Sequence, residues 1–201
     1  MALVKYNNNS ISSVTATAAL PAGAMTLIST STTSSGVSTV SIASGIDSTY
    51  PIYVFKLINI HISNDYADLT VNFRDGGSSY DATKTSTSFY AAHDEGDTAT
   101  GLTYNAGKDL AQGTGANPIC SIGNANDESA NGTIYLFSPS STTYVKHFIT
   151  NVHCMDGYDY TVNHFTSGYC NVTAAIDGIQ FGVSAGTIDS GVIKMYGIKD
   201  S

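Results

Sequence analysis

The stretch Ile52-Tyr-Val-Phe-Lys-Leu-Ile-Asn-Ile-His-Ile62 is a run of mostly β-branched and aromatic side chains that directly follows Pro51. Alternate residues form two faces, one starting Ile52, Val54 and the other Tyr53, Phe55, and both are largely apolar. This pattern favours a central β-strand whose two faces are both covered. A buried strand of this length needs a sheet around it, so we expect the chain to be organised around this strand.

The composition indicates one domain, or one domain plus an arm, in a chain of 201 residues that is large enough to bury a core. The formal net charge is −8, and Arg74 is the only arginine. Binding to nucleic acid or to an anionic membrane is therefore not expected. Charged residues make up only 12% of the chain, and uncharged strand-forming and turn-forming residues dominate. These features predict an all-β protein.

Turn residues separate a series of short apolar or alternating segments along the chain. Besides Ile52–Ile62 we expect strands at 24–29, 37–42, 69–73, 83–90, 132–137, 144–152, 158–169, 176–183 and 191–198. Many short strands without a long helix predict an antiparallel β-sandwich, most simply of the jelly-roll type. Residues 1–24 are expected to form an extended N-terminal arm, and 25–201 the sandwich domain.

Residues 91–130 lack a clear hydrophobic period, and we expect a long irregular insertion there. Within it, Thr103–Gln112 is compatible with a short helix. A long irregular segment in a compact domain usually carries an interface or a binding surface, so we expect such a surface here.

The N-terminus shows no signal-peptide pattern, and no apolar run is long enough for a membrane span, so we expect a protein made in a cytoplasm. The three cysteines, Cys120, Cys154 and Cys170, lack metal-ligand spacing. Reduced thiols are the preferred interpretation, and a bridge between Cys154 and Cys170 is the alternative.

The sharpest candidate for a ligand site is Asp94-Glu-Gly-Asp97 beside His93. Three carboxylates, from Asp94, Glu95 and Asp97, could supply oxygen ligands to calcium, and Gly96 permits a tight bend. The spacing is not that of an EF-hand loop, and a solvated acidic loop is the plainer interpretation. Our prediction is no metal site, with these carboxylates as the calcium alternative.

Catalytic patterns are weak. Asp127 and Glu128 are adjacent, so in a strand they would point to opposite faces and could not form a glycosidase pair. A pair of Glu95 with Glu128 can be drawn, but nothing in the sequence supports it, and the chain has no tryptophan on which to stack a sugar. The histidines form no metalloprotease or Ser-His-Asp pattern and are interpreted as core or surface residues: His61, His93, His147, His153 and His164. We predict no catalytic residue, no cofactor and no enzymatic activity, with a polysaccharide depolymerase as the enzymatic alternative.

The chain contains 13 tyrosines. Tyrosine combines a large contact area with a polar tip, which suits protein interfaces and sugar-binding faces. We expect most of them to lie along strands as cross-strand partners.

Several strand and turn sequences together resemble a family of small, mostly uncharacterised structural proteins of tailed bacteriophages, especially marine ones. The stretches that carry the resemblance are Leu3-Val-Lys-Tyr-Asn-Asn-Asn-Ser10, Gly23-Ala-Met-Thr-Leu-Ile28, Tyr53-Val-Phe-Lys-Leu-Ile-Asn-Ile-His61, Asp109-Leu-Ala-Gln-Gly-Thr-Gly115, Gly123-Asn-Ala-Asn-Asp-Glu-Ser129, Tyr144-Val-Lys-His-Phe-Ile149 and Gly191-Val-Ile-Lys-Met-Tyr-Gly-Ile198. The resemblance implies a virion component and supplies no catalytic residues.

From this resemblance we expect a capsid decoration (cement or head accessory) protein in the virion, assembled in the host cytoplasm. Its partners would be the major capsid protein or other virion subunits, bound through the arm at 1–24 and through loops, and it would form a homo-oligomer. The alternative is a tail-fibre or spike module that binds a host glycan.

Overall fold

The structure, a computed structural model, describes residues 25–199, which form β-strands and no helix. The strands are β1 (Met25–Thr33), β2 (Thr39–Ile42), β3 (Ile52–Ile62), β4 (Ala67–Arg74), β5 (Lys84–Asp94), β6 (Thr100–Tyr104), β7 (Leu110–Gly113), β8 (Asn117–Ile122), β9 (Ala130–Phe137), β10 (Lys146–Met155), β11 (Tyr160–Cys170), β12 (Gly178–Val183) and β13 (Ile188–Ile198). The all-β prediction is confirmed. No helix in residues 25–199 is long and apolar enough to span a membrane. The arm expected at 1–24 lies outside the described residues.

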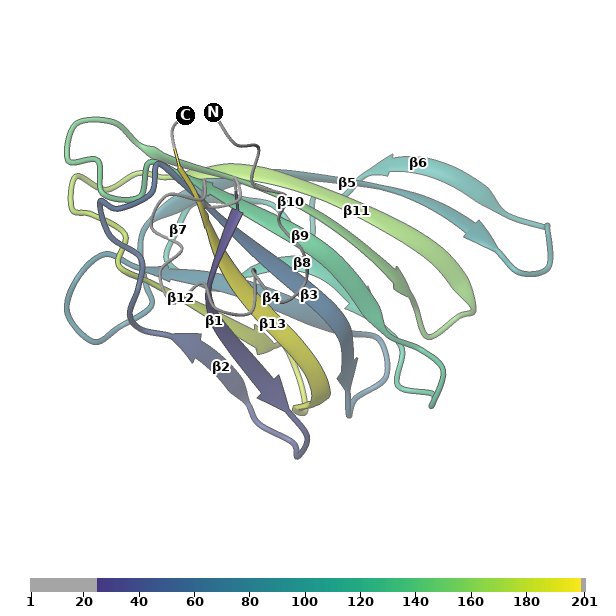
Figure 1. Cartoon of the computed structure of the whole chain (residues 1–201). Coiled ribbons are helices and arrows are strands. Elements are labelled where there is room, and N and C mark those ends of the chain that lie inside the picture. The colour runs from purple at the N-terminus through teal and green to yellow at the C-terminus, as the bar shows by residue number, and fades with distance from the viewer. Residues whose placement is uncertain (1–24, 200–201) are drawn as a thin grey trace, which may run out of the picture.

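The strands form two antiparallel sheets that pack face to face (Figure 1). The large sheet has the order β1-β13-β3-β9-β10-β11-β5-β6, with β7 also paired to β5, and the small sheet has the order β2-β12-β4-β8. The predicted antiparallel β-sandwich is confirmed. The jelly-roll form is not confirmed, because a jelly-roll has eight strands in two Greek keys and these sheets have nine and four strands.

Aromatic pairs join the two sheets in the core. Phe55 on β3 contacts Phe181 on β12, with ring centroids 6.1 Å apart, and Phe73 on β4 contacts Phe148 on β10 at 5.1 Å. All four side chains are fully buried. Aromatic side chains bury large apolar areas, so these pairs are major contributors to the attraction between the sheets.

β3 has the predicted boundaries and lies between β13 and β9, but only one of its faces is covered throughout. Tyr53, Phe55 and Leu57 are buried against the small sheet, whereas Lys56 is half-buried and Ile58 is exposed on the outer face. The expectation of two covered faces is therefore wrong. Val54, also on the outer face, is fully buried, so this face is covered in its first half and exposed at Ile58.

A β-bulge at Asn59 changes which residues of β3 face the core. Asn59 has φ 49°, and the register with both neighbouring strands shifts at this position. One extra residue in a strand exchanges its inward and outward faces. Ile60 and Ile62 therefore become buried, while His61 turns outward and contacts Asp189, with 3.7 Å between Nδ1 and Oδ2.

Residues 91–130 are not a long irregular insertion, because the end of β5 and the whole of β6, β7 and β8 lie within them. The helix considered for Thr103–Gln112 is also wrong: this segment is the end of β6, a turn and most of β7. In the turn, the Lys108 N–H donates to the carbonyl of Asn105 at 3.1 Å. Every residue of β6 is exposed, so that strand lacks the apolar alternation by which strands are recognised in a sequence.

All three cysteines are free and buried. The Cys154 Sγ–H donates to the carbonyl of Ser121 at 2.9 Å, and its nearest thiol partner is Cys120, not Cys170. The alternative bridge between Cys154 and Cys170 is not present. The preferred interpretation, reduced thiols, agrees with the structure.

The large sheet extends beyond the small one at one end. β8 forms the edge of the small sheet and packs over β10 and β11. The next strands of the large sheet, β5 and β6, continue past that edge and project to the right in Figure 1. The uncovered part of the large sheet is the floor of the site described below.

Candidate functional site

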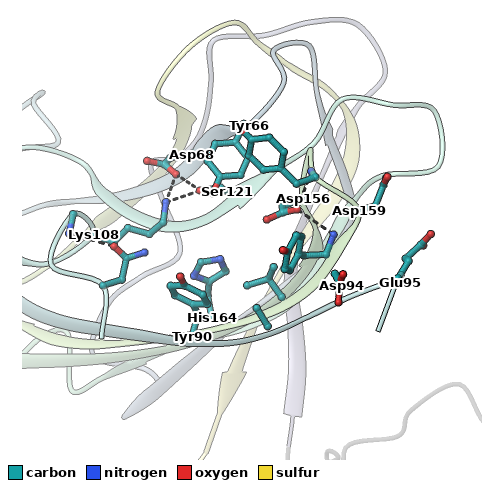
Figure 2. A pocket seen from close by; sticks show the side chains of 17 residues that line it. Tyr66, Asp68, Tyr90, Asp94, Glu95, Lys108, Ser121, Asp156, Asp159 and His164 are labelled. Atoms are coloured by element: carbon teal, nitrogen blue, oxygen red, sulfur yellow. Dashed lines mark hydrogen bonds and ion pairs between the residues drawn. The ribbon is translucent and has the colours of Figure 1, made fainter. Parts of the chain in front are cut away.

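A hollow of about 1000 Å³ lies where the large sheet extends past the edge of the small sheet (Figure 2). This volume is at the upper end of the range usual for ligand pockets in proteins. The floor comes from β5 and β11, one wall from β4, β8 and the β6–β7 turn, and the other wall from the β3–β4 and β10–β11 turns. We call this hollow the groove.

The floor carries a buried histidine. His164 on β11 pairs in register with Tyr90 on β5, and their rings lie 5.4 Å apart. Burial, together with the nearby charge of Lys108, lowers the pKa of His164 to about 4, so the ring is neutral at neutral pH. The residue is only 3% exposed, and among residues 25–199 its Nδ1 atom has no hydrogen-bond partner. In Figure 2 the ring projects from the floor strand into the hollow, on the side of Lys108.

An ion pair forms the wall on the side of the small sheet. The ammonium of Lys108 contacts the carboxylate of Asp68 and donates to Ser121 Oγ at 2.8 Å, and Ser121 Oγ donates to Asp68 Oδ1 at 2.7 Å. Asp68 and Ser121 are register partners on β4 and β8, so the sheet itself places them side by side. The Lys108 carbonyl accepts a hydrogen bond from Asn117 Nδ2 at 3.1 Å, which holds the turn that carries the lysine.

The opposite wall is aromatic and comes from two turns. The rings of Tyr66 and Tyr158 meet edge to face at 4.9 Å, and both side chains are about half-exposed or more. Asp156 Oδ1 accepts the N–H groups of Tyr158 and Tyr160, which shapes the β10–β11 turn. A Cβ atom on Gly157 would overlap the carboxylate of Asp65, so the Asp65 side chain would have to move where this turn meets the β3–β4 turn. Burial, and then the charge of Asp156, raises the pKa of the Tyr66 phenol, which therefore stays protonated.

The carboxylates considered for calcium lie at the end of β5 and in the β5–β6 turn, and they do not converge. Asp94 accepts hydrogen bonds from the N–H groups of Thr98 and Ala99, at 2.9 and 2.8 Å, and from the Thr98 hydroxyl. These hydrogen bonds, that of the Thr98 hydroxyl first, lower the pKa of Asp94, whose role is to close the β5–β6 turn. Asp97 points elsewhere, is 91% exposed and pairs with His93 at 3.3 Å.

Of the three candidates, then, Asp94 and Glu95 line the groove and Asp97 does not. Within residues 25–199, no group of three His, Cys, Asp or Glu side chains has a spacing that could hold a metal ion. The glycosidase pair of Glu95 with Glu128 is not assembled either. Glu128 is buried, accepts the N–H of Ala125 and lines a different hollow.

The groove lining is acidic and rich in tyrosine. Its ionised side chains are five carboxylates and one ammonium, with His164 neutral: Asp68, Asp94, Glu95, Asp156, Asp159 and Lys108. Four tyrosines share the lining: Tyr66, Tyr90, Tyr158 and Tyr160. Part of the 91–130 segment lines the groove, including Asp94–Gly96, Lys108 and Ser121, but both tyrosines of the aromatic wall lie outside that segment.

Several of these residues gave no signal in the sequence. Tyr66 and Tyr158 lie in turns, not along strands as expected for most tyrosines, and Tyr66 has φ 58°. The sequence did offer one hint. Tyr66 follows Asn64-Asp65 and Tyr158 lies between Gly157 and Asp159, and such sequences form turns, which place a ring at the surface. His164 was interpreted only as a core or surface residue. Comparison of the chain with protein-family models and with curated proteins gave no match.

Proposed function

We propose that this chain is a structural protein of a bacteriophage virion that decorates the capsid as a cement or head accessory protein. The proposal starts from the resemblance of its strand and turn sequences to virion proteins. It places the chain in the virion after assembly in the host cytoplasm, bound to the major capsid protein or other virion subunits and to copies of itself. It assigns the chain no catalytic activity, and inactivity on host polysaccharide is the test against a depolymerase.

The observation that carries the proposal is the free edge of the large sheet. β1 is the last strand on that side, and among the described residues it pairs only with β13. Soluble proteins usually protect such an edge with charged residues or proline, because its free N–H and C=O groups can bind a strand of another chain. β1 contains neither, although its pairing with β13 has a bulge between Leu27 and Ser29, and Met25 and Leu27 are 42% and 51% exposed. These features support docking by strand addition onto another virion subunit.

Purified heads and tails, separated and analysed by mass spectrometry, test the location, and we expect the protein in heads. Finding it only in tails would overturn the capsid proposal.

The free edge of β1 is tested by adding the Leu27→Lys variant to heads that lack this protein and measuring cosedimentation. Leu102→Lys is the matched control, since Leu102 is 74% exposed on β6 at the other end of the sheet. We expect the first variant to lose binding and the second to retain it.

A second candidate function is that of a tail-fibre or spike module that recognises a host glycan, and the groove favours it. Exposed tyrosine rings next to carboxylate acceptors suit the apolar faces and hydroxyl groups of sugars. A glycan array with purified full-length protein tests this candidate. Binding that is lost in Tyr158→Ala supports it, and binding to no glycan on the array overturns it.

A further inference from the structure

The groove combines a hydrogen-bonding atom without a partner, an excess of negative charge and exposed aromatic faces. From this combination we propose that the groove binds a saccharide carrying free amino groups and discriminates against acidic saccharides. This inference rests on the second candidate function and names the class of glycan that such a module would recognise.

The Nδ1 atom of His164 is buried and has no hydrogen-bond partner among the described residues. A buried polar atom without a hydrogen bond costs free energy, and such atoms normally have a partner in the functional state of a protein. The neutral ring carries one proton, so one tautomer leaves Nδ1 able to accept a hydrogen bond from an ammonium or hydroxyl group. The ring lines the hollow beside Tyr90, but Nδ1 itself is covered, so a ligand donor reaches this atom only when the side chains around the ring move aside.

Negative charge exceeds positive charge among the side chains that line the groove. The Lys108 ammonium is committed to Asp68 and only 8% of its side chain is exposed, so it offers little to an anionic ligand. Asp94 and Asp156 accept backbone N–H groups of their own turns. Two carboxylates at the rim, Glu95 and Asp159, are exposed and have no side-chain partner among the described residues.

The backbones that carry these two rim carboxylates are joined. The Glu95 N–H donates to the Asp159 carbonyl at 3.2 Å, which joins the β5–β6 turn to the β10–β11 turn. Asp159 has φ 61°, a conformation that aspartate tolerates better than most residues. Two negative charges at the same rim, with no ion pair to a cation among residues 25–199, attract an ammonium group and repel a carboxylate or phosphate.

The aromatic wall offers exposed rings to a ligand. Tyr66 and Tyr158 present their rings at the mouth of a hollow of about 1000 Å³, which is larger than one amino-acid side chain needs. A sugar ring can stack on these faces, and an ammonium over a tyrosine ring adds a cation–π attraction. The ligand class that uses the rings, the rim carboxylates and His164 together is an amine-bearing saccharide.

The test compares two ligands that differ only in charge: a glucosamine tetrasaccharide and its fully N-acetylated counterpart. With the full-length protein, titration calorimetry should show binding of the amine form at least about threefold tighter, as expected for partly exposed ion pairs. The difference should shrink when salt is raised from about 20 mM to about 200 mM, because screening weakens exposed charges. A glucuronate-containing tetrasaccharide should bind more weakly than either.

Variants locate the effect. Glu95→Gln with Asp159→Asn should remove the preference for the amine form and leave binding of the acetylated form intact. Asp127→Asn is the matched control, because Asp127 is an exposed carboxylate that lines a different hollow. Tyr158→Ala should abolish binding of both saccharides without changing the thermal unfolding temperature, since this side chain is 68% exposed.

The outcomes separate the inference from the function on which it rests. Equal affinity for both tetrasaccharides, lost in Tyr158→Ala, overturns the charge preference while the glycan-binding function stands. Binding of oligolysine with no saccharide binding overturns both, and assigns the groove to a basic peptide. Preference for the glucuronate ligand also overturns the inference.

Discussion

Gly191 on β13 lies directly against the bulge at Asn59 on β3: a Cβ atom on Gly191 would be 2.9 Å from the Asn59 carbonyl oxygen. Gly191 also has φ 135°, a backbone conformation that side chains oppose. The bulge therefore depends on a glycine that is more than a hundred residues away in sequence. Since the bulge decides that Ile60 and Ile62 face the core, this contact sets the inward face of the second half of β3.

The first prediction concerns this contact. Gly191→Ala should lower the free energy of unfolding by about 2–4 kcal/mol, because it combines overpacking with backbone strain. Urea denaturation measures the change. Gly115→Ala is the control, since a Cβ atom there meets nothing within 4 Å, and it should cost less than about 0.5 kcal/mol. Equal stability of the two variants would show that the bulge does not need a glycine.

The second prediction is a loss of stability in acid caused by His164. Its folded-state pKa of about 4 lies below the ordinary histidine value of 6.5, so the unfolded chain binds more protons between these pH values. The contribution is complete above pH 6.5 and is lost as the pH falls through about 4, up to about 3 kcal/mol. Urea midpoints measured across this range should fall less steeply in His164→Gln. An unchanged slope would mean that the ring is protonated in the folded protein.

The third prediction concerns the asymmetry of the ion pair in the groove wall. Lys108 is 8% exposed and Asp68 is 26% exposed, and Asp68 also accepts a hydrogen bond from Ser121. Asp68→Asn should cost about 2–3 kcal/mol because it leaves the buried ammonium without an anion, whereas Lys108→Met should cost about 1 kcal/mol or less. The double variant should be more stable than Asp68→Asn alone. Simple additivity of the two changes would contradict this account.

The fourth prediction is that the thiols are unreactive in the folded protein. Cys120, Cys154 and Cys170 are buried, and burial raises the pKa of the Cys170 thiol to about 12 even though Lys84 and Lys146 oppose the shift. Because the thiolate is the reactive form, iodoacetamide at neutral pH should leave the intact mass unchanged until urea is added, and three thiols should then react. Rapid labelling of the native protein would contradict the burial of these side chains.

The sequence predicted the sheet elements well where a strand has at least one face in the core. The boundaries of Ile52–Ile62 are those of β3, because β-branched and aromatic side chains combine high strand propensity with a clear start after Pro51. Thr100–Tyr104 escaped detection because none of its side chains is buried, so its pairing with β5 left no apolar pattern.

The groove was predictable only in part. The segment around Asp94 and Glu95 stood out as a cluster of charge, and the 91–130 region was expected to carry a surface. His164 did not stand out in the sequence. Its ring is buried, and its Nδ1 atom lacks a partner among the described residues, only because the fold places β11 beside β5 and close to Lys108. Tyr66 and Tyr158 are 92 positions apart, and only the meeting of two turns brings their rings together.

By itself the sequence predicted an antiparallel β-sandwich with a net negative charge, because composition and local alternation decide strand formation and charge. Only the tertiary structure decided that one sheet is wider than the other and that the excess width forms the floor of a groove. It also decided which face of β3 is buried beyond Asn59. These features depend on contacts between strands that are distant in sequence, and the local pattern of residues within one strand does not predict such contacts.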